Sequence, residues 1–424
     1  MNIKEIINKK RLNKELTKEE ISYVINGFVD GSVTDYQMSA LLMAITINGM
    51  TFFETLNLTD CMLKSGDILD LSKIDGIVCD KHSTGGIGDK VTIILAPLLA
   101  SLGIKVAKMS GRGLGYTGGT IDKLESIDNF NVNLDENTFI KQVNEINMAI
   151  TSATANLDIA DKKIYSLRDV TATVDSIPLI ASSIMSKKLA SNADLIVIDV
   201  KVGAGALMKN KKDAIKLARF LIDIGRHYDK KVICLLTNMN QPLGYCIGNK
   251  LEIKESIDAL KGKGAKDLME VVYSIASIII SNVNNISIME AFELASCNIN
   301  NNKAYSKFKE FVKYQGGNID KFKIDAKYID IKSDNEGYIS EVDAYEIGKI
   351  ALNLGAGRLN KDDKIDYNVG IELFAKVNDY VNVGDTLGRI YYNNKEINFD
   401  DLKKCFIFSK EKVKNDIIYG KIDL

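Results

Sequence analysis

Two glycine-rich loops, each preceded by a short apolar run and followed by a helical segment, constrain this chain more than any other feature of its sequence. The first loop, KHSTGGIGDK, spans residues 81–90, and the second, SGRGLGYTGGT, spans residues 110–120. Between them the residue pattern predicts a helix over 91–102 and a strand over 104–109. Loops that follow strands in this way lie at one edge of a parallel sheet, so we expect the two loops to meet.

Both loops are rich in groups that bind anions. Their hydroxyl groups and cations are Ser83, Thr84, Thr92, Ser110, Thr117, Thr120, Lys81, Lys108 and Arg112. Hydroxyls, fixed positive charges and the N–H groups of helix N-termini all bind phosphate. The pattern therefore predicts a site for a small anion.

The second loop also satisfies a dinucleotide-binding pattern. Gly113, Gly115 and Gly118 fit G-x-G-x-x-G after a strand, which leaves a nicotinamide-dependent oxidoreductase as one alternative. Such an enzyme needs an acidic residue at the end of the next strand. The candidates Asp128 and Asp135 are both expected in a loop, which disfavours this alternative.

Composition narrows the classes of function. The chain has 424 residues and a net charge of −1, so its charge predicts neither a nucleic-acid nor a membrane partner. Its six cysteines lie at 61, 79, 234, 246, 297 and 405, without a C-x-x-C pair. This spacing favours reduced thiols and a cytoplasmic location over disulfides or a zinc site. We expect neither a signal peptide nor a membrane span.

The residue patterns divide the chain into five segments. Residues 1–65 are expected to be helical, with capping boxes at Thr17 to Glu20 and Thr51 to Glu54. An α/β segment at 66–157 contains both loops, and 158–190 returns to helix, interrupted by the polar residues 168–175. A further βαβ pattern occupies 191–330, which supports a mostly parallel sheet. Residues 331–424 alternate between apolar and polar residues and predict a small α+β domain that is rich in strands.

Part of this last segment, AKVNDYVNVGDTL, is similar to the hairpin of biotinyl and lipoyl carriers. Lys376 would precede the turn, however, and a carrier needs its modified lysine at the hairpin tip. We therefore interpret the C-terminal domain as structural.

The quoted loops also resemble those of a known enzyme family. SGRGLGYTGGTIDKLES resembles the signature of the thymidine and pyrimidine-nucleoside phosphorylases, and DKHSTGGIGDK resembles their phosphate-binding segment. A third block, YSLRDVTATVDSIPLIASSIMSKKLA at 165–190, is similar to their pyrimidine-binding segment. The resemblance covers nearly the whole chain. It implies that 1–65 and 158–190 form one discontinuous helical domain, through which the protein is a homodimer.

The activity that the resemblance implies is a pentosyl transfer used in nucleoside salvage. Uridine, thymidine or deoxyuridine would react reversibly with inorganic phosphate to give the free base and a (deoxy)ribose 1-phosphate. Positive charge then develops on the sugar and negative charge on the base, so phosphate and base-binding donors are needed on opposite sides of the sugar. The two sets belong to different domains, and catalysis would require the domains to close.

The resemblance also assigns site residues. The phosphate would contact Lys81, Ser83, Thr92, Ser110 and Thr120. The catalytic residues would be His82, Arg168 and Lys187. The base and sugar would contact Lys108, Leu114, Tyr165, Arg168, Ile180, Ser183 and Lys187.

Lys108 bears on the choice of sugar. A lysine at this position resembles the broad-specificity branch, because its ammonium can donate to a ribose 2′-hydroxyl. Strict thymidine phosphorylases tend to have methionine there, and such an enzyme is the alternative.

The resemblance further implies a potassium ion, held by Gly88, Leu243, Cys246 and Glu255 together with a threonine at position 90. This chain has Lys90 instead, which puts the ion in doubt. We expect the lysine ammonium to take the cation position and pair with Glu255; a solvated Lys90 is the alternative. No other cofactor is expected.

Two other functions remain open from the residues alone. A phosphoribosyltransferase of related fold would need acidic residues for magnesium pyrophosphate, which 158–190 does not obviously supply. A non-catalytic nucleoside-binding protein is the second. Release of uracil from uridine, with and without phosphate, would separate all of these functions.

Overall fold

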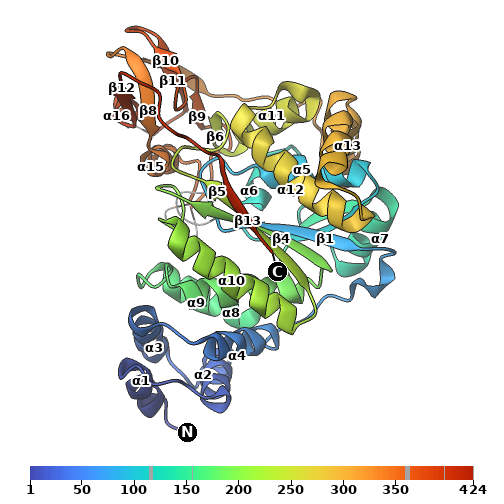
Figure 1. Ribbon diagram of the computed structural model, residues 1–424, viewed down its shortest axis with the longest axis vertical. Helices are drawn as coiled ribbons and strands as arrows, with labels where there is room; N and C mark the ends of the chain where they lie inside the picture. Colours follow the sequence, from blue (N-terminus) through green and yellow to red (C-terminus); the bar gives the residue numbers. More distant parts are fainter. Residues whose placement is uncertain (114–117, 155, 359–362, 396, 424) are drawn as a thin grey trace.

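The computed structural model describes residues 1–113, 118–154, 156–358, 363–395 and 397–423. A helical bundle lies at one end of the molecule, a sheet with helices on both faces occupies the middle, and a β-rich region lies at the other end (Figure 1). The predicted fold class is therefore confirmed: a discontinuous helical domain, a mostly parallel α/β domain and a C-terminal β-rich region.

The helical bundle is built from two separate parts of the chain. Its helices are α1 (Ile3–Arg11), α2 (Lys18–Asp30), α3 (Asp35–Asn48), α4 (Phe52–Leu63), α8 (Ile159–Asp169) and α9 (Ile177–Ala190). Both expected capping boxes are present at the starts of α2 and α4. Ala160, Ile164 and Leu179 of the second part are buried in one apolar cluster with residues of α1 to α4.

The central sheet has the order β13-β5-β4-β1-β2-β3. Its strands are β1 (Val78–Ser83), β2 (Lys105–Ser110), β3 (Met148–Ser152), β4 (Leu195–Val202), β5 (Lys231–Asn238) and β13 (Ile418–Ile422). The first five are parallel, and β13 adds an antiparallel edge. Successive residues enter different cores: Val197 packs in one apolar cluster, while Ile196 and Ile198 pack in the other. Both faces are therefore buried, as the continuous apolar strands predict.

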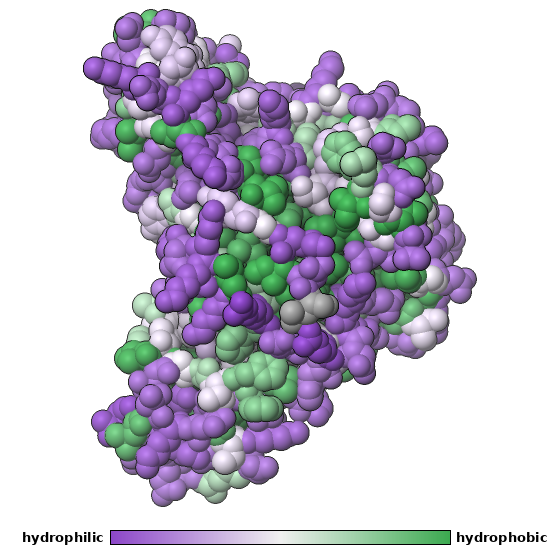
Figure 2. Space-filling model, in the orientation of Figure 1, coloured by the Kyte–Doolittle hydropathy of each residue, from purple (hydrophilic) through white to green (hydrophobic). Residues whose placement is uncertain are grey.

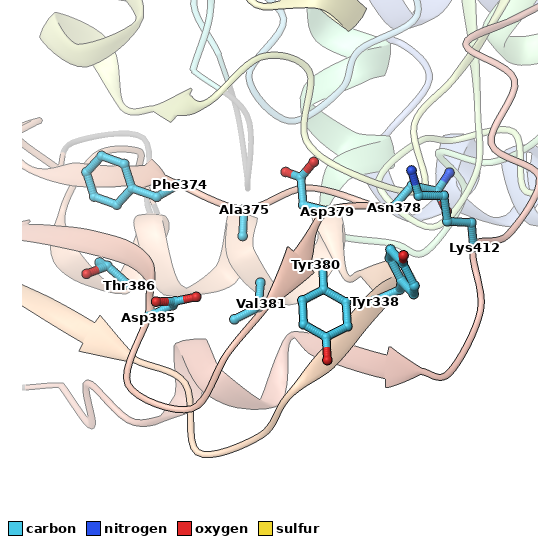
Figure 3. Close-up of a pocket in the computed structure, with 10 residues that line it drawn as sticks. All are labelled: Tyr338, Phe374, Ala375, Asn378, Asp379, Tyr380, Val381, Asp385, Thr386 and Lys412. Carbon is cyan, nitrogen blue, oxygen red and sulfur yellow. The ribbon is translucent and has the colours of Figure 1, made fainter.

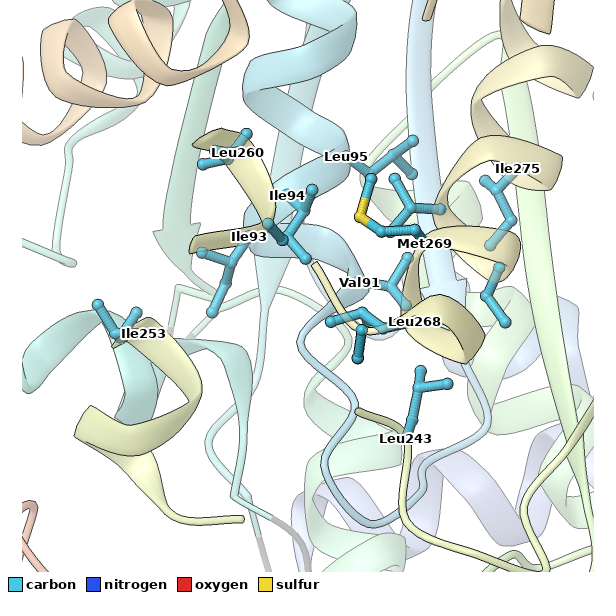
Figure 4. Close-up of a cluster of buried hydrophobic side chains, with 14 of the residues drawn as sticks. Val91, Ile93, Ile94, Leu95, Leu243, Ile253, Leu260, Leu268, Met269 and Ile275 are labelled. Carbon is cyan, nitrogen blue, oxygen red and sulfur yellow. The ribbon is translucent and has the colours of Figure 1, made fainter. Parts of the chain in front are cut away.

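Helices cover the two faces of this sheet. They are α5 (Val91–Ser101), α6 (Thr120–Glu125), α7 (Glu136–Ile146), α10 (Lys211–His227), α11 (Asn249–Asp258), α12 (Lys266–Asn284), α13 (Ile288–Asn300) and α14 (Lys303–Tyr314), with short helices at Leu71–Lys73 and Ala259–Lys263. Figure 4 shows the start of α5, where Val91 and Leu95 lie against Leu243, Leu268 and Met269. The helix that follows the first glycine-rich loop thus begins in the apolar core.

The C-terminal region contains β7 (Lys327–Lys332), β8 (Gly337–Val342), α15 (Ala344–Leu354), β9 (Gly370–Leu373), β10 (Tyr380–Val381), β11 (Thr386–Tyr392), α16 (Asp401–Lys404) and β12 (Phe406–Ser409). Among these strands, residues 344–354 form the helix α15, as a β-rich α+β domain allows. Asp343 caps it by accepting from Tyr345 and Glu346 N–H, and Ile347, Ile350 and Leu354 are buried at helical spacing.

Two strands cross between the regions. β6 (Cys246–Ile247), from the α/β part of the chain, pairs with β9, and β13 returns from the C-terminal part to pair with β5. Long-range pairing of this kind was not expected from the sequence. The proposed boundaries near 65, 157, 190 and 330 remain predictions.

Lys376 is buried and donates to Pro242 O, Gly244 O and Asp267 Oδ2. These contacts agree with a structural role and not with a carrier lysine at a hairpin tip. Within the described ranges, the structure has no single helix with the length and apolar composition to cross a membrane.

Candidate active site

The first glycine-rich loop leaves the carboxyl end of β1, in the middle of the sheet. Thr84 fastens it to β4, because its N–H donates to Asp199 O at 3.1 Å and its Oγ1 accepts from Lys201 N–H at 2.9 Å. Gly85 and Gly88 have φ of 95° and 74°, in the left-handed region that favours glycine. A Cβ at Gly88 would also lie 2.6 Å from Leu243 O. The loop can therefore adopt this path only with glycine at 88.

The second loop is organised by a carboxylate. Asp122, fully buried on α6, accepts from Gly113 N–H at 2.6 Å, from Gly119 N–H at 3.1 Å and from Arg358 Nη1 at 2.9 Å. Thr120 is the first residue of α6, and Ser110 is the last residue of β2. Arg112, a candidate cation, forms an ion pair with Glu125. Leu114 and Thr117 lie outside the described residues.

Lys81 lies in a buried group of alternating charges. Its Nζ is 3.4 Å from Asp89 Oδ2 and 3.7 Å from Asp199 Oδ2, and Lys201 Nζ is 2.7 Å from the same Asp199 oxygen. Burial opposes ionisation of Asp89, but Lys81 and Lys201 outweigh it and hold the pKa of Asp89 well below its usual range. Ser83 ends β1, and Thr92 lies in the first turn of α5. A phosphate would compete with these carboxylates for Lys81.

A second ionic group joins the two domains. Asp80, which precedes Lys81 on β1, accepts from Lys188 Nζ of α9 at 2.5 Å and from Lys108 Nζ of β2 at 3.2 Å. Lys108 also donates to Lys81 O at 2.6 Å. Burial and the neighbouring lysines lower the pKa of Lys108 to about 8, although Asp80 opposes this shift.

His82 follows Lys81 on β1 and is partly exposed. Its low-dielectric surroundings, together with Lys188, Lys108, Lys187 and Lys81, lower its pKa well below the usual range. The imidazole is therefore neutral at pH 7 in the ligand-free protein. In this form it can donate one N–H bond.

The base-binding candidates lie together on α8 and α9. Lys187 Nζ donates to Ser183 Oγ at 2.9 Å, lies 2.6 Å from Asp161 Oδ2, and is 5.6 Å from the centre of the Tyr165 ring. Arg168 Cζ lies 5.9 Å from the same ring centre. These four side chains therefore form one cluster around Tyr165.

Arg168 differs from the expectation in two respects. It belongs to the last turn of α8, not to a polar loop. Its guanidinium is buried and donates to Thr173 O at 3.1 Å, Leu179 O at 3.1 Å and Val174 O at 2.7 Å. Three of the five guanidinium N–H groups thus hold the turn after α8, which leaves two for a ligand. Ile180 is buried in the apolar cluster between α9 and the sheet.

The residues expected to bind potassium do come together, but around a lysine. Lys90 Nζ donates to Leu243 O, Cys246 O and Glu255 Oε2, and a Cβ on Gly88 would contact Leu243 O. The expected pairing of Lys90 with Glu255 is therefore present, and the lysine ammonium donates to oxygen atoms that the resemblance assigns to potassium. Within the described residues, no cluster of His, Cys, Asp and Glu could hold a metal ion.

A broad surface hollow of ≈ 700 Å³ lies elsewhere, in the C-terminal region. Figure 3 shows that Tyr338, Phe374, Tyr380 and Lys412 line it, and the predicted site residues are absent from its lining. We therefore assign the candidate site to the sheet edge and α8–α9, not to this hollow.

Sequence reasoning missed the charged partners of the site. They are Asp80, Asp89, Asp122, Asp161, Lys188, Asp199 and Lys201. Asp80 precedes the first loop, Asp89 lies within it and Asp122 follows the second loop, so their positions in the sequence indicated that they lie near the site. Asp161 and Lys201 lie far from the loops in the chain and carried none.

Three comparisons with known proteins agree with this geometry. Residues 4–66 match the helical bundle domain and residues 75–305 the α/β domain of a glycosyl transferase family, and residues 338–407 match the C-terminal domain of pyrimidine nucleoside phosphorylase. Among solved structures, the chain resembles anthranilate phosphoribosyltransferase from Thermus thermophilus. Its TM-score is 0.58 at 17% identity, and the match covers 73% of this chain and 98% of that one. This second likeness supports the fold alone.

Curated relatives match over almost their whole length. The chain is 50% identical to a pyrimidine-nucleoside phosphorylase of Staphylococcus haemolyticus, covering 95% of this chain and 94% of the relative. It is 49% identical to that of Geobacillus stearothermophilus, with the same coverage. It is 50% identical to that of Bacillus subtilis, covering 94% and 93%. With the matching fold, loops and domains, these identities show that the chain belongs to the pyrimidine-nucleoside phosphorylase family.

Proposed function

We propose that this protein catalyses the reversible phosphorolysis of pyrimidine nucleosides to the free base and a pentose 1-phosphate. One contact carries the proposal: Lys188 of α9 bonds to Asp80 of β1. Lys187 precedes Lys188, and Lys81 follows Asp80. The contact therefore brings the base-binding helix beside the strand that leads into the phosphate loop, as a reaction between a nucleoside and phosphate requires.

The phosphate would bind at the first loop and the start of α5. Lys81 supplies fixed charge, while Ser83 and Thr92 supply hydroxyl donors. The N-terminus of α5 adds backbone dipoles that favour an anion. Ser110 and Thr120 would complete the site from the second loop. Because Lys81 is already paired with two carboxylates, phosphate binding would exchange one of these partners for a phosphate oxygen.

The base would bind at Tyr165, Arg168, Ser183 and Lys187. As the glycosidic bond breaks, the pyrimidine leaves with negative charge spread over its carbonyl oxygens. The Lys187 ammonium and the two remaining guanidinium N–H groups of Arg168 can donate to those oxygens. His82, neutral before phosphate arrives, would donate an N–H to a base carbonyl. A bound phosphate dianion beside it would favour its protonation and make it a proton donor to the departing base.

We further propose that the domains close around both substrates and expel water. Asp67 N–H donates to Asn156 O at 2.9 Å, so two segments that connect the domains lie against each other, and we propose that the hinge is there. Small-angle scattering should therefore show a smaller radius of gyration when phosphate and a nonreactive nucleoside are added together. An unchanged radius would exclude closure.

We propose a homodimer formed through the helical bundle. The helix α3 carries apolar side chains on both its buried and its exposed face. Met38, Leu41 and Ile45 are buried, while Tyr36 and Ile47 are 73% and 74% exposed. A helix that is apolar on all sides is usually buried, and a second copy would cover the exposed stripe. In the hydropathy view, green residues lie on the outside of the helical end (Figure 2). Sedimentation should give twice the mass of the chain.

We also propose that uridine as well as thymidine is a substrate, because Lys108 can donate to a 2′-hydroxyl. A role in nucleoside salvage in the cytoplasm fits this activity. The cysteines support it, since all six are free thiols and five of them are buried.

Incubation with uridine tests the proposed function directly. Free uracil and ribose 1-phosphate should form only when inorganic phosphate is present. Uracil release at the same rate without phosphate would indicate a hydrolase, and no release under either condition would indicate a binding protein. Replacing phosphate by pyrophosphate and magnesium tests the phosphoribosyltransferase alternative.

A further inference from the structure

Lys90 extends its ammonium group into a cage of oxygen atoms from another part of the chain. Its Nζ donates to Leu243 O at 2.8 Å, to Cys246 O at 2.9 Å and to Glu255 Oε2 at 2.6 Å. The lysine side chain is 0% exposed. All three ammonium donors are therefore satisfied inside the protein. Burial disfavours the charge, but Glu255 and Glu252 outweigh it, so the pKa of Lys90 is raised and the group stays charged.

The cage does not depend on Lys90 for its shape. Glu255 Oε1 accepts from Tyr245 N–H at 2.7 Å, and Glu255 Oε2 accepts from Cys246 N–H at 2.9 Å. Gly244 permits this close approach, because a Cβ there would lie 2.5 Å from Glu255 Oε1. The carboxylate is thus fixed by the backbone at 245–246. Removing the lysine side chain would leave the oxygen atoms in place.

Two carbonyl oxygens and a carboxylate oxygen are ligands for a hard cation of low charge. Carbonyl oxygens replace the hydration shell of potassium in proteins, and an ammonium group resembles potassium in charge and size. Lys123 of α6 does not supply charge to the cage, because it is paired with Glu252 at 2.6 Å. The cage therefore requires one positive charge, and Lys90 supplies it from within the chain.

We propose that Lys90 is a built-in cation that replaces a monovalent metal ion, and that the cage becomes a potassium site when the ammonium is removed. Lys90 lies at the end of the first glycine-rich loop, immediately before α5, while Leu243 and Cys246 precede α11 and Glu255 lies on it. Lys90 therefore links the first glycine-rich loop to residues 243–255 without a metal ion from solution. The order of the phosphate site is then independent of the potassium concentration.

Lys90→Thr tests the proposal, because threonine keeps an oxygen ligand and vacates the ammonium position. Thermal unfolding is compared in potassium chloride and in tetramethylammonium chloride at equal ionic strength. The wild type should have the same Tm in both salts. In the organic salt, the Tm of the variant should be on the order of 5 °C below that of the wild type, because the buried carboxylate of Glu255 loses its partner. Potassium should restore at least half of this loss.

Two control variants separate the cage from general effects of salt. Lys90→Met removes the charge but still fills the space, so its lower Tm should not respond to potassium. Lys254→Thr removes a lysine that lies next to Glu255 on α11. Lys254 pairs with Glu372 at 2.7 Å, but its side chain is 41% exposed. The Tm of this variant should be the same in both salts.

The readout is unfolding, so the proposal stands or fails independently of the proposed reaction. A Lys90→Thr variant that ignores potassium would show that the cage is not a latent cation site. A wild-type Tm that rises in potassium relative to tetramethylammonium would show that Lys90 does not replace the ion. This second comparison decides the matter even when Lys90→Thr does not fold. With the active wild type, the exchange of salts should also leave kcat/KM for uridine unchanged.

Discussion

Asp161 holds the ammonium of Lys187, and its replacement should weaken stabilisation of the departing base. Lys187 Nζ lies 2.6 Å from Asp161 Oδ2, and the side chain of Asp161 is 4% exposed. Ser183 Oγ takes a second N–H of the ammonium, which leaves the third for a ligand. Asp161 is therefore a positioning residue: it fixes the lysine that would touch the base, without touching the base itself.

The size of the effect follows from the geometry. Two unit charges at this separation attract by roughly 6 kcal/mol at an effective dielectric constant near 20, before desolvation is counted. Lys187 is 36% exposed, so water screens the pair and can replace part of the interaction. We expect about 1–2 kcal/mol of transition-state stabilisation to be lost in Asp161→Asn, which lowers kcat/KM for uridine about 5- to 30-fold.

A series of uridines with different leaving groups distinguishes this role from simple loss of structure. A 5-fluoro substituent makes the departing base more acidic, so it needs less help from a cation. The loss in Asp161→Asn should therefore be largest with uridine and smallest with 5-fluorouridine. Asp161→Glu, which keeps the charge, should recover part of the activity.

Asp158→Asn is the matched control, because Asp158 is buried at the start of the same helix and makes no bond to Lys187. Burial and the neighbouring Asp161 raise the pKa of Asp158 to about 6. An amide there should leave the dependence on leaving group unchanged. If Asp161→Asn lowers kcat/KM by the same factor with every nucleoside, Asp161 does not act through the charge on the base.

Three further outcomes are expected. Lys108→Met should reduce kcat/KM for uridine more than for thymidine, and equal losses would remove Lys108 from sugar selection. Because Lys108 is charged below its pKa of about 8 and neutral above it, the ratio of uridine to thymidine activity should fall as the pH rises through 8; a flat ratio would contradict this assignment. Gly66→Ala should lower the free energy of unfolding, measured by chemical denaturation, by about 1–3 kcal/mol, because the new Cβ would lie 2.2 Å from Asn156 O. Gly111→Ala is the control: there is open space around Gly111, so this variant should change the free energy of unfolding little.

Local patterns predicted the elements that carry a strong local signal. The capping boxes, the buried strands β4 and β5, and the two strand–loop–helix units all depend on residues that are close in sequence. The position of the helix α15 within the β-rich α+β region was not predicted, because its first residues alternate between apolar and polar as those of a strand do. Its capping residue Asp343 and the helical spacing of Ile347, Ile350 and Leu354 would have corrected the interpretation.

Local sequence patterns predicted that the two glycine-rich loops would lie at one edge of a parallel sheet, because both loops follow strands that run in the same direction. The sequence also predicted Tyr165 on one helix and Ser183 and Lys187 on the next, but it put Arg168 in the polar segment between them, whereas Arg168 lies in the last turn of α8. The Lys90–Glu255 pair was expected from the resemblance, but the pairs of Lys188 with Asp80 across the domains and of Lys187 with Asp161 are visible only in the folded chain. Each pair joins residues between 26 and 165 positions apart. Which charged residues pair depends on how distant segments pack and exclude water, and local sequence patterns do not contain this information.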